Sequence, residues 1–319
     1  MSAEQSKPQG SDLTEGVTAN DIPDGGMIAG HVGDDAVLIT RHGDEFFAIG
    51  ATCSHYNGPL AEGLVVGDTV RCPWHHARFC LRSGEAIGAP AFNRLSCWRI
   101  ERRDGKVFVR ERIDAADPAK ARGPAGAAGK PERVVIVGGG AAGFACAEML
   151  RREGFTGALT LLSADADAPY DRPNCSKDYL AVNAPEDWMP LRPAEFYKDQ
   201  AIELRLSTEV RGIDSKAGRV ALANGEVIAF DKLLLATGAE PVRLDFPGAG
   251  EPHVHVLRSL ADSRAIIAKA KTARQAVVIG ASFIGLEAAA ALRARDIEVH
   301  VVPRNAVLLS ACSAPNTAT

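Results

Sequence analysis

The sequence has no apolar run near the length of about 20 residues that a membrane-spanning helix requires. It has no excess of basic residues either. The net charge is −4, which gives no electrostatic reason to expect a nucleic acid or an anionic membrane as a partner. Residues 1–10 contain no apolar core and no arginine, so neither a secretory signal nor a mitochondrial transit peptide is expected. We therefore expect a cytoplasmic protein.

Seven cysteines make an odd number, and their spacing is not that of a small disulfide scaffold, so a reducing compartment is expected. A chain of 319 residues has room for two or three domains. Changes in composition predict a disordered lead-in over residues 1–15, a β-rich domain over 16–113 and a flexible Ala/Gly/Pro-rich linker over 114–131.

The β-rich domain contains two pairs of potential metal ligands. Cys53-Ser-His55 is followed, after 16 residues, by Cys72-Pro-Trp-His75. Two thiolates and two imidazoles are the ligands of a Rieske 2Fe–2S cluster, in which two histidines replace two cysteines on one iron. Zinc is the alternative, although structural zinc sites more often pair cysteines two to four residues apart.

This ligand spacing resembles the Rieske ferredoxin family, and the resemblance covers residues 16–113. Rieske proteins of the cytochrome bc type carry an extra cysteine in each ligand loop. Here Asn57, Gly58 and Trp74 occupy those neighbourhoods, so the resemblance is to the soluble ferredoxins. His76 stands where soluble Rieske ferredoxins often have glycine. We expect it to lie beside the site or in solvent, and not to be a ligand.

A glycine-rich turn organises the second half of the chain. Val134–Val137 is an apolar, mostly β-branched run, which predicts a strand buried on both faces. The following Gly138-x-Gly140-x-x-Gly143, which includes Ala142, opens a predicted helix. Strand, turn and helix in this order predict a dinucleotide site, with the pyrophosphate at the helix N-terminus. A glycine-rich turn without function is the alternative.

Polar residues follow the next predicted strand, residues 158–163. Asp165 lies about 20 residues beyond the last glycine, where an acid binds an adenosine ribose, and Asp167 competes for this role. Arg172 and Lys177 place two cations near the dinucleotide. As bare sequence they could equally belong to a solvated loop.

Two stretches resemble signatures of the pyridine nucleotide–disulfide oxidoreductase superfamily, closest to its ferredoxin reductases and apoptosis-inducing-factor-like proteins. One is Pro169-Tyr-Asp-Arg-Pro-Asn-Cys-Ser-Lys177, and the other is residues 230–241 with their Thr237-Gly238 turn. Val210 matches the place where the family's backbone touches adenine. The resemblance implies FAD at the first nucleotide site.

The strand–turn–helix pattern recurs after residues 275–279. In the resembling family this second module binds NAD(P)H. Glu287 matches the family's acidic residue near the nicotinamide, and with Lys177 it is a candidate catalytic residue; a glutamate on a helix surface is the alternative. The candidate contacts to the nicotinamide cofactor are Gly280, Ser282, Ile284, Gly285 and Glu287.

The resemblance implies the first part of an FAD domain over residues 132–250 and the start of an NAD(P) domain over 251–302. Residues 303–319 do not follow the family pattern, which continues for a comparable length. We therefore expect a C-terminal truncation, and a frameshift near Pro303 is a hypothesis for its origin. The tail also lacks the family's usual acid after the preceding predicted strand. If the frameshift hypothesis is right, the restored glutamate would bind the ribose 2′-OH and favour NADH; the sequence as it stands leaves NADH and NADPH both open.

The expected fold is a multidomain chain, with a small all-β Rieske domain followed by α/β Rossmann-like FAD- and NAD(P)-binding folds. The expected function is an oxidoreductase that passes electrons from NAD(P)H through FAD to a Rieske cluster, and then to an unidentified redox protein or small molecule. Within this class the chain could supply electrons to an oxygenase or nitrite reductase. The alternative from another class is a Rieske electron carrier attached to a truncated, non-catalytic nucleotide-binding remnant.

Overall fold

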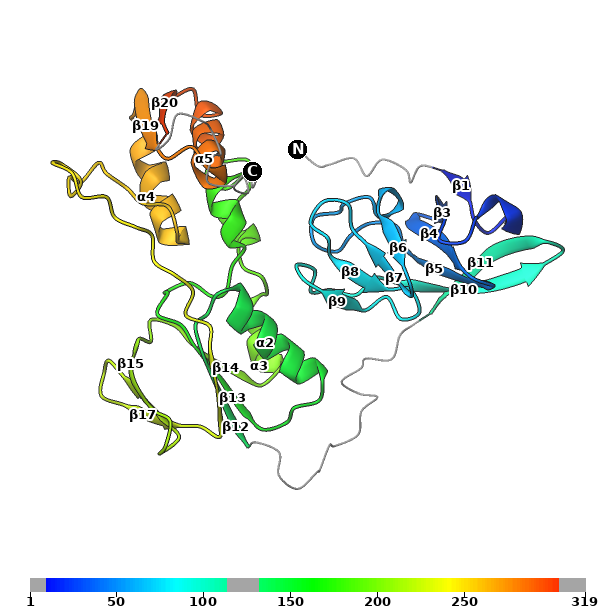
Figure 1. The fold of residues 1–319 in the computed structure, drawn as a ribbon, viewed down its shortest axis with the longest axis horizontal. Coiled ribbons are helices and arrows are strands. Elements are labelled where there is room, and N and C mark those ends of the chain that lie inside the picture. The colour runs from blue at the N-terminus through cyan, green and yellow to red at the C-terminus, as the bar shows by residue number, and fades with distance from the viewer. Residues whose placement is uncertain (1–9, 114–131, 304–319) are drawn as a thin grey trace, which may run out of the picture. The chain divides into compact units, whose positions relative to one another are not determined.

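The computed structural model describes residues 10–113 and 132–303 (Figure 1). The chain divides into two compact units, whose described parts are these two ranges. Residues 1–9, the expected linker and residues 304–319 lie outside the described residues.

The first unit consists of two β-sheets. A seven-stranded sheet has the order β1-β3-β4-β5-β10-β11-β2, and a four-stranded sheet has the order β6-β7-β8-β9. All pairings are antiparallel except that of β1 with β3. The all-β fold expected for this part of the chain is confirmed. The strands are β1 (Ser11–Asp12), β2 (Val17–Thr18), β3 (Met27–Val32), β4 (Asp35–His42), β5 (Glu45–Gly50), β6 (Leu64–Val66), β7 (Thr69–Arg71), β8 (Arg78–Cys80), β9 (Ala86–Gly88), β10 (Cys97–Arg103) and β11 (Lys106–Ile113).

Strand β4 explains how this unit is held together. Successive side chains of a strand point to opposite faces, yet Val37, Leu38 and Ile39 are all fully buried. Val37 and Ile39 pack with Trp98 on one face, while Leu38 packs with Phe79 of the four-stranded sheet on the other. The large sheet is therefore covered on both sides, and the smaller sheet, which positions the candidate ligand loops, is fixed to it.

The N-terminal boundary differs from the expected disordered lead-in. Ser11 and Asp12 form β1 and pair in parallel with Gly30 and His31. Leu13 is fully buried in the core. A single buried leucine between polar residues produces no periodic pattern, so nothing in the residue types indicates this short strand.

The second unit contains three sheets. A four-stranded parallel sheet has the order β14-β13-β12-β18, β15 to β17 form an antiparallel sheet, and β19 and β20 form a parallel pair. Its elements are β12 (Arg133–Val137), α2 (Ala141–Arg152), β13 (Ala158–Leu162), α3 (Ala194–Asp199), β14 (Ile202–Arg205), β15 (Val210–Asp214), β16 (Arg219–Leu222), β17 (Val227–Ala229), β18 (Lys232–Leu235), α4 (Leu260–Ala270), β19 (Gln275–Ile279), α5 (Phe283–Arg293) and β20 (Glu298–Val302).

The buried apolar run at residues 134–137 lies inside its sheet, as the sequence predicts. Strand β12 pairs in parallel with β13 on one side and with β18 on the other. All four residues of the run are buried. The two-stranded β19–β20 sheet differs, because Val277, Ile279 and Val302 are exposed on it.

Among the described residues, we find no helix of the length and apolar character needed to cross a membrane.

Candidate functional sites

The first candidate ligand loop follows β5 and is closed by two backbone hydrogen bonds. The Cys53 N–H donates to the Gly58 carbonyl at 2.8 Å, and the Asn57 N–H donates to the Cys53 carbonyl at 2.9 Å. Asn57 has φ of +58°, in the left-handed region that asparagine tolerates better than most residues. This tight loop carries the Cys53–His55 pair.

The second candidate loop, between β7 and β8, repeats this backbone pattern. The Cys72 N–H donates to the Ala77 carbonyl at 2.9 Å, and the His76 N–H donates to the Cys72 carbonyl at 3.1 Å. His76 has φ of +61° and therefore occupies the same left-handed position as Asn57 in the first loop. This conformation explains why glycine suits the position, since a side chain there is strained.

The two loops bring the four candidate ligands together in like pairs. Cys53 and Cys72 are both buried, and their thiols share a hydrogen bond. The imidazoles of His55 and His75 lie with ring centroids 5.0 Å apart at an angle of 85°. Each loop therefore contributes one sulfur to a sulfur pair and one ring to an imidazole pair.

The environment of the sulfurs is suited to metal binding. Burial raises the pKa of Cys53 to about 11, the neighbouring Cys72 adds to this rise, and a hydrogen bond from the His55 backbone N–H opposes it. A thiol of this kind needs the charge of a bound cation to ionise. Within the described residues, no three His, Cys, Asp or Glu side chains form a ready site for one metal ion. A cluster with two ligands on each of two irons does not require such a group.

Gly58 and Trp74 lie together between the loops. A Cβ added to Gly58 would lie 2.9 Å from the Cys72 sulfur and 3.2 Å from the Trp74 ring. No side chain fits there without displacing one of them. Gly58 and Trp74 thus form a close non-covalent contact between the loops, in the neighbourhoods where cytochrome-bc-type proteins carry their extra cysteines.

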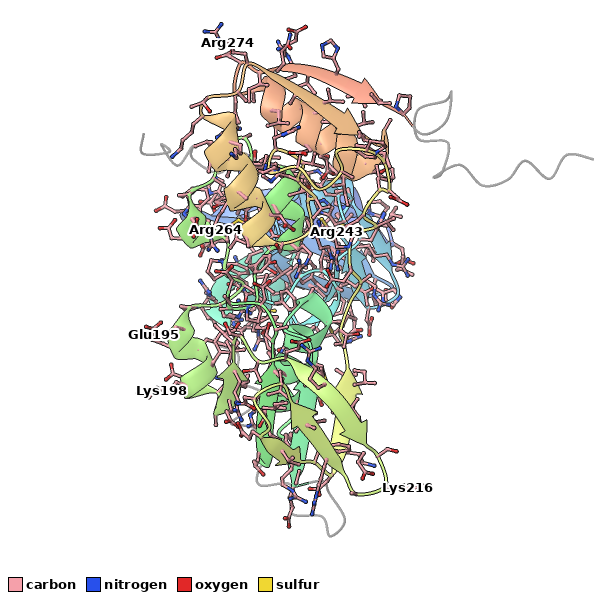
Figure 2. The ribbon with its side chains drawn as sticks, turned by 90° about the vertical axis from the view of Figure 1, so that its left-hand side faces the viewer. Glu195, Lys198, Lys216, Arg243, Arg264 and Arg274 are labelled. Carbon is pink, nitrogen blue, oxygen red and sulfur yellow. The ribbon has the colours of Figure 1, made fainter. Side chains whose placement is uncertain are left out.

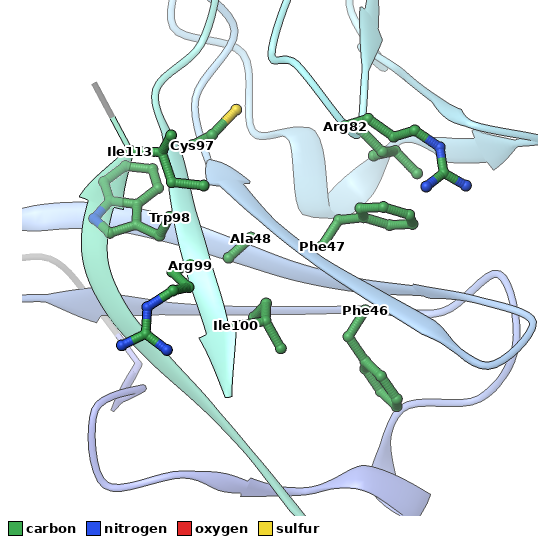
Figure 3. Close-up of a pocket in the computed structure, with 10 residues that line it drawn as sticks. Phe46, Phe47, Ala48, Arg82, Cys97, Trp98, Arg99, Ile100 and Ile113 are labelled. Carbon is green, nitrogen blue, oxygen red and sulfur yellow. The ribbon is translucent and has the colours of Figure 1, made fainter. Parts of the chain in front are cut away.

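A groove with a cavity volume of about 310 Å³ lies elsewhere on this unit, along β5 and β10 (Figure 3). Phe46, Phe47, Trp98 and Arg99 line it, and none of the four candidate ligands does. The Arg82 guanidinium lies over the Phe47 ring, 4.9 Å from its centroid, and forms ion pairs with Glu45 and Asp68. The groove therefore belongs to the sheet surface and not to the ligand loops.

The first glycine turn has the geometry that its spacing predicts. Gly138 has φ of +118°, and a Cβ there would lie 2.0 Å from the Ala236 carbonyl oxygen. A Cβ on Gly143 would lie 1.9 Å from the Gly138 carbonyl oxygen, so the helix packs directly on the turn. A Cβ on Gly140 would meet nothing within 4 Å. Two glycines are thus required by packing, and the middle one faces open space.

The N-terminus of α2 is free to accept an anion. Gly140 is the N-cap and has no side chain to bond the first N–H groups, and Ala142 is exposed in the first turn. Unbonded N–H groups and the positive end of the helix dipole favour phosphate at such a position. The structure therefore offers an open backbone surface where the sequence predicts the pyrophosphate.

The Thr237-Gly238 turn lies beside this loop, although nearly one hundred residues separate the two in the sequence. The Ala236 N–H donates to the Val137 carbonyl at 2.8 Å, and Gly238 has φ of +72°. The Thr237 nitrogen would lie 3.0 Å from a Cβ on Gly138. The first glycine turn and the Thr237-Gly238 turn are thus in contact.

The structure distinguishes the two competing acids after β13. Asp167 forms two hydrogen bonds of 2.8 and 2.9 Å with Arg264 of α4, which Figure 2 labels. The Asp165 carboxylate is partly exposed, and it accepts hydrogen bonds from the Tyr170 hydroxyl at 2.9 Å and from the Asp167 backbone N–H at 3.3 Å. Asp167 is therefore committed to an ion pair, whereas Asp165 retains capacity for a further hydrogen bond.

Arg172 and Val210 have local roles in the structure. Arg172 donates to the Arg258 carbonyl at 2.6 Å and its guanidinium lies 4.9 Å from the Tyr170 ring centroid. Val210 begins β15 opposite Leu222 and is partly buried. Arg172 thus belongs to an ordered segment and not to a fully solvated loop.

Glu287 connects the two nucleotide modules. Its Oε2 accepts a hydrogen bond from Ser176 Oγ at 2.6 Å, and its Oε1 lies 3.7 Å from Lys177 Nζ. The neighbouring Cys175 is buried among apolar residues, and burial raises the pKa of its thiol to about 12. Glu287 is therefore not a solvated helix residue, and Cys175 has the environment of a packed thiol.

The second glycine turn copies the first. Gly280 has φ of +113°, and a Cβ on Gly285 would lie 2.0 Å from the Gly280 carbonyl oxygen. Ser282 is the N-cap of α5 but makes no capping hydrogen bond, and both Ser282 and Ile284 are exposed. The N–H groups of this helix also remain available to an anion.

Together these features define a Rieske-type iron–sulfur domain joined to a reductase fold with two dinucleotide-type turns. Residues 15–99 match the Rieske [2Fe-2S] domain, and residues 132–318 match the Pyridine nucleotide-disulphide oxidoreductase family. The chain belongs to the pyridine nucleotide-disulphide oxidoreductase family and carries a Rieske domain. Both predicted resemblances are confirmed. The two matches support the predicted cofactor set of a 2Fe–2S cluster, FAD and NAD(P)H.

The chain is also similar to individual proteins. The chain is 33% identical to human "Apoptosis-inducing factor 3" over 304 residues, which cover 92% of this chain and 50% of that protein. It is 42% identical to rhodocoxin reductase of Rhodococcus erythropolis over 169 residues, or 53% of this chain and 40% of that protein. The chain thus spans half or less of the length of these relatives.

Among solved structures, a ferredoxin reductase for the CYP199A2 system from Rhodopseudomonas palustris is similar, with a TM-score of 0.55 and 38% identity. The match covers 58% of this chain and 45% of that chain. The putidaredoxin reductase–putidaredoxin complex gives a TM-score of 0.54 at 33% identity, with the same coverage of 58% and 45%. These likenesses agree with the α/β reductase fold described above.

Proposed function

We propose that this chain is an FAD-dependent oxidoreductase that passes electrons from NAD(P)H through FAD to a Rieske cluster, and from there to a redox protein or small molecule. The observation that carries the reductase part is the contact of Glu287, in the second nucleotide module, with Ser176 and Lys177 in the first. This contact brings a carboxylate and an ammonium together where the two modules meet, as transfer between two bound dinucleotides requires.

The paired thiols and imidazoles of Cys53, Cys72, His55 and His75 are the proposed cluster ligands. The sulfurs would hold one iron and the neutral imidazoles the other. The close Gly58–Trp74 contact and the repeated loop backbone constrain the positions of these donors. This donor set fits a Rieske cluster better than a single zinc ion, because it is arranged as two separate like pairs.

The residues proposed to bind FAD surround the first glycine turn and its neighbouring segments. Asp165 is proposed to bind the ribose, and the exposed backbone at Gly140 to accept the pyrophosphate. The proposed FAD contacts are Gly138, Gly140, Ala142, Gly143, Asp165, Arg172, Lys177, Val210, Thr237 and Gly238.

The proposed NAD(P)H contacts lie at the second glycine turn. When bound, the cofactors supply hydride acceptance at the flavin and one-electron transfer at the iron–sulfur centre. Lys177 and Glu287 would orient the reacting rings and balance charge between them. The proposed contacts are Gly280, Ser282, Ile284, Gly285 and Glu287.

The proposal is tested by reconstituting the purified chain with iron, sulfide and FAD. We expect two irons per chain, a Rieske electron paramagnetic resonance (EPR) signal after reduction, and flavin that survives gel filtration and is bleached by NADH or NADPH. One zinc and no iron would overturn the cluster assignment. Flavin that is lost on the column, or is retained but not bleached, would overturn the reductase assignment.

A specific observation favours a second function, a Rieske electron carrier with a non-catalytic nucleotide-binding remnant. Val277, Ile279 and Val302 are exposed on the β19–β20 sheet. Exposed apolar residues on a sheet face lose the free energy that burial would give them. A normal cluster without retained flavin is the result that this function predicts.

A further inference from the structure

Tyr56 has a place in the first ligand loop that its sequence position does not predict. Its ring stacks on His55 with a centroid separation of 4.1 Å and an interplanar angle of 22°. It also meets His75 edge-on at 5.8 Å and 78°. One aromatic side chain thus contacts both imidazoles of the candidate iron site, although the two histidines come from different loops.

We propose that Tyr56 is a positioning residue for both histidine ligands and shields the imidazole side of the iron–sulfur centre from water. The inference rests on the proposed function, since it takes His55 and His75 as ligands. The Tyr56 ring stacks on one imidazole and meets the other edge-on, so it restricts rotation of the two imidazoles about different axes. Ligand orientation and solvent access are the properties through which a surrounding shell adjusts a metal centre.

The backbone supports this placement. The hydrogen bond from the Asn57 N–H to the Cys53 carbonyl closes a turn immediately after Tyr56, and the Asn57 backbone is in the left-handed region. A second link holds the same loop, because Ser54 Oγ donates to the Asn93 carbonyl at 2.5 Å. Tyr56 therefore projects from a constrained turn. Its exposed fraction is 37%, so the rest of the residue is covered by its neighbours.

The two ligand loops carry no fixed charge of their own. Residues 52–59 and 72–77 contain no Asp, Glu, Lys or Arg. Within these loops, the Tyr56 ring is therefore the cover that meets both imidazoles. Reduction adds one negative charge to the centre, and water solvates that charge better than a ring does. Removing the ring should therefore favour the reduced state and raise the reduction potential.

The test uses the full chain with Tyr56→Ala, Tyr56→Leu and Tyr56→Phe, and with Leu64→Ala as a control that shortens another exposed side chain of this unit. The measurements are iron content, the EPR spectrum and the midpoint potential. We expect Tyr56→Phe and Leu64→Ala to match the unchanged chain. Tyr56→Ala should raise the potential beyond the spread of those controls and broaden the EPR lines, because the imidazoles become less ordered.

Tyr56→Leu keeps apolar bulk without an aromatic ring, so it decides the outcome if Tyr56→Ala does not retain iron. Broadened lines in Tyr56→Leu support the inference, because leucine keeps apolar cover but cannot stack on the imidazoles. Normal iron with unchanged lines in either ring-deleting variant, or with an unchanged or lowered potential in Tyr56→Ala, overturns it and leaves the proposed function standing. An unchanged chain that binds no iron overturns the proposed function instead.

Discussion

Ser176 Oγ donates a 2.6 Å hydrogen bond to Glu287 Oε2 across 111 positions of sequence. The serine precedes Lys177 in the segment that resembles a flavin site, and the glutamate lies on α5 of the second nucleotide module. The contact leaves the other carboxylate oxygen facing the Lys177 ammonium at 3.7 Å. One carboxylate thereby connects both modules, which makes it the most direct point at which to test the reductase proposal.

We predict that Glu287→Ala lowers the rate of flavin reduction by NADH about tenfold or more while FAD remains bound. The loss corresponds to about 1.4 kcal/mol of transition-state stabilisation, which is modest for removal of a charged positioning group. Stopped-flow absorbance measures the rate. Ser176→Ala keeps the carboxylate and should have a smaller effect. Equal rates in Glu287→Ala and the unchanged chain would contradict a role for Glu287 in the reaction.

The glycine turn allows packing to be separated from cofactor binding. Gly143→Ala should lower the free energy of unfolding by about 1–3 kcal/mol, because its Cβ would lie 1.9 Å from the Gly138 carbonyl oxygen. Gly140→Ala should leave the melting temperature nearly unchanged, since open space surrounds its Cβ, yet weaken FAD binding by obstructing the pyrophosphate. Thermal unfolding and flavin retention measure the two effects. Normal FAD affinity in a folded Gly140→Ala protein would argue against the site.

The two adjacent histidines of the second ligand loop provide a matched pair for the cluster. His75→Ala should abolish the Rieske EPR signal. His76→Gly should retain the signal and melt at the same or a slightly higher temperature, because a left-handed φ of +61° costs a non-glycine residue about 1–2 kcal/mol. Greater freedom of glycine in the unfolded chain offsets part of this gain. Loss of iron from His76→Gly would mean that His76, and not only His75, supports the metal.

Asp231 should make the second unit sensitive to acid. Its carboxylate accepts hydrogen bonds from the Arg133 side chain and from the backbone N–H groups of Arg133 and Glu132, and these lower the pKa of Asp231 to about 2. Because the pKa is lower in the folded state than its ordinary value of 3.8, the carboxylate stabilises the folded state fully at pH values above 3.8. This stabilisation is lost as the pH falls toward about 2. Melting temperature measured from pH 6 to pH 3 should fall less steeply for Asp231→Asn. Parallel curves would contradict the assignment.

Local patterns in the sequence were sufficient for part of this structure. The run at 134–137 and the two glycine turns depend on residues that are close in sequence, and the structure forms them where they were predicted. The contacts that connect distant segments left no such pattern. The ion pair that Asp167 forms with Arg264 joins residues 97 positions apart, since Arg264 lies on α4. Ser176 lies in the segment that resembles a flavin site, yet no residue near it in the sequence indicates Glu287 as its partner.

The iron-site loops show the same division. The spacing of the cysteines and histidines indicated which four side chains lie together, because thiolate and imidazole groups are the donors that such a cluster uses. The matching hydrogen bonds of the two loops depend on φ angles at Asn57 and His76, two residues whose type does not require a left-handed conformation. The contact of Tyr56 with both imidazoles depends in turn on those backbone angles. Sequence spacing alone therefore could not place the aromatic ring.

The matching backbones of the two ligand loops carry a consequence for metal uptake. Since each loop provides one thiol and one imidazole, neither iron of the proposed centre could obtain its protein ligands from a single loop. A distortion of either loop would deprive both metals at once. Loading and loss should therefore be all-or-none, with intact centres and empty protein in the population and few half-filled molecules between them.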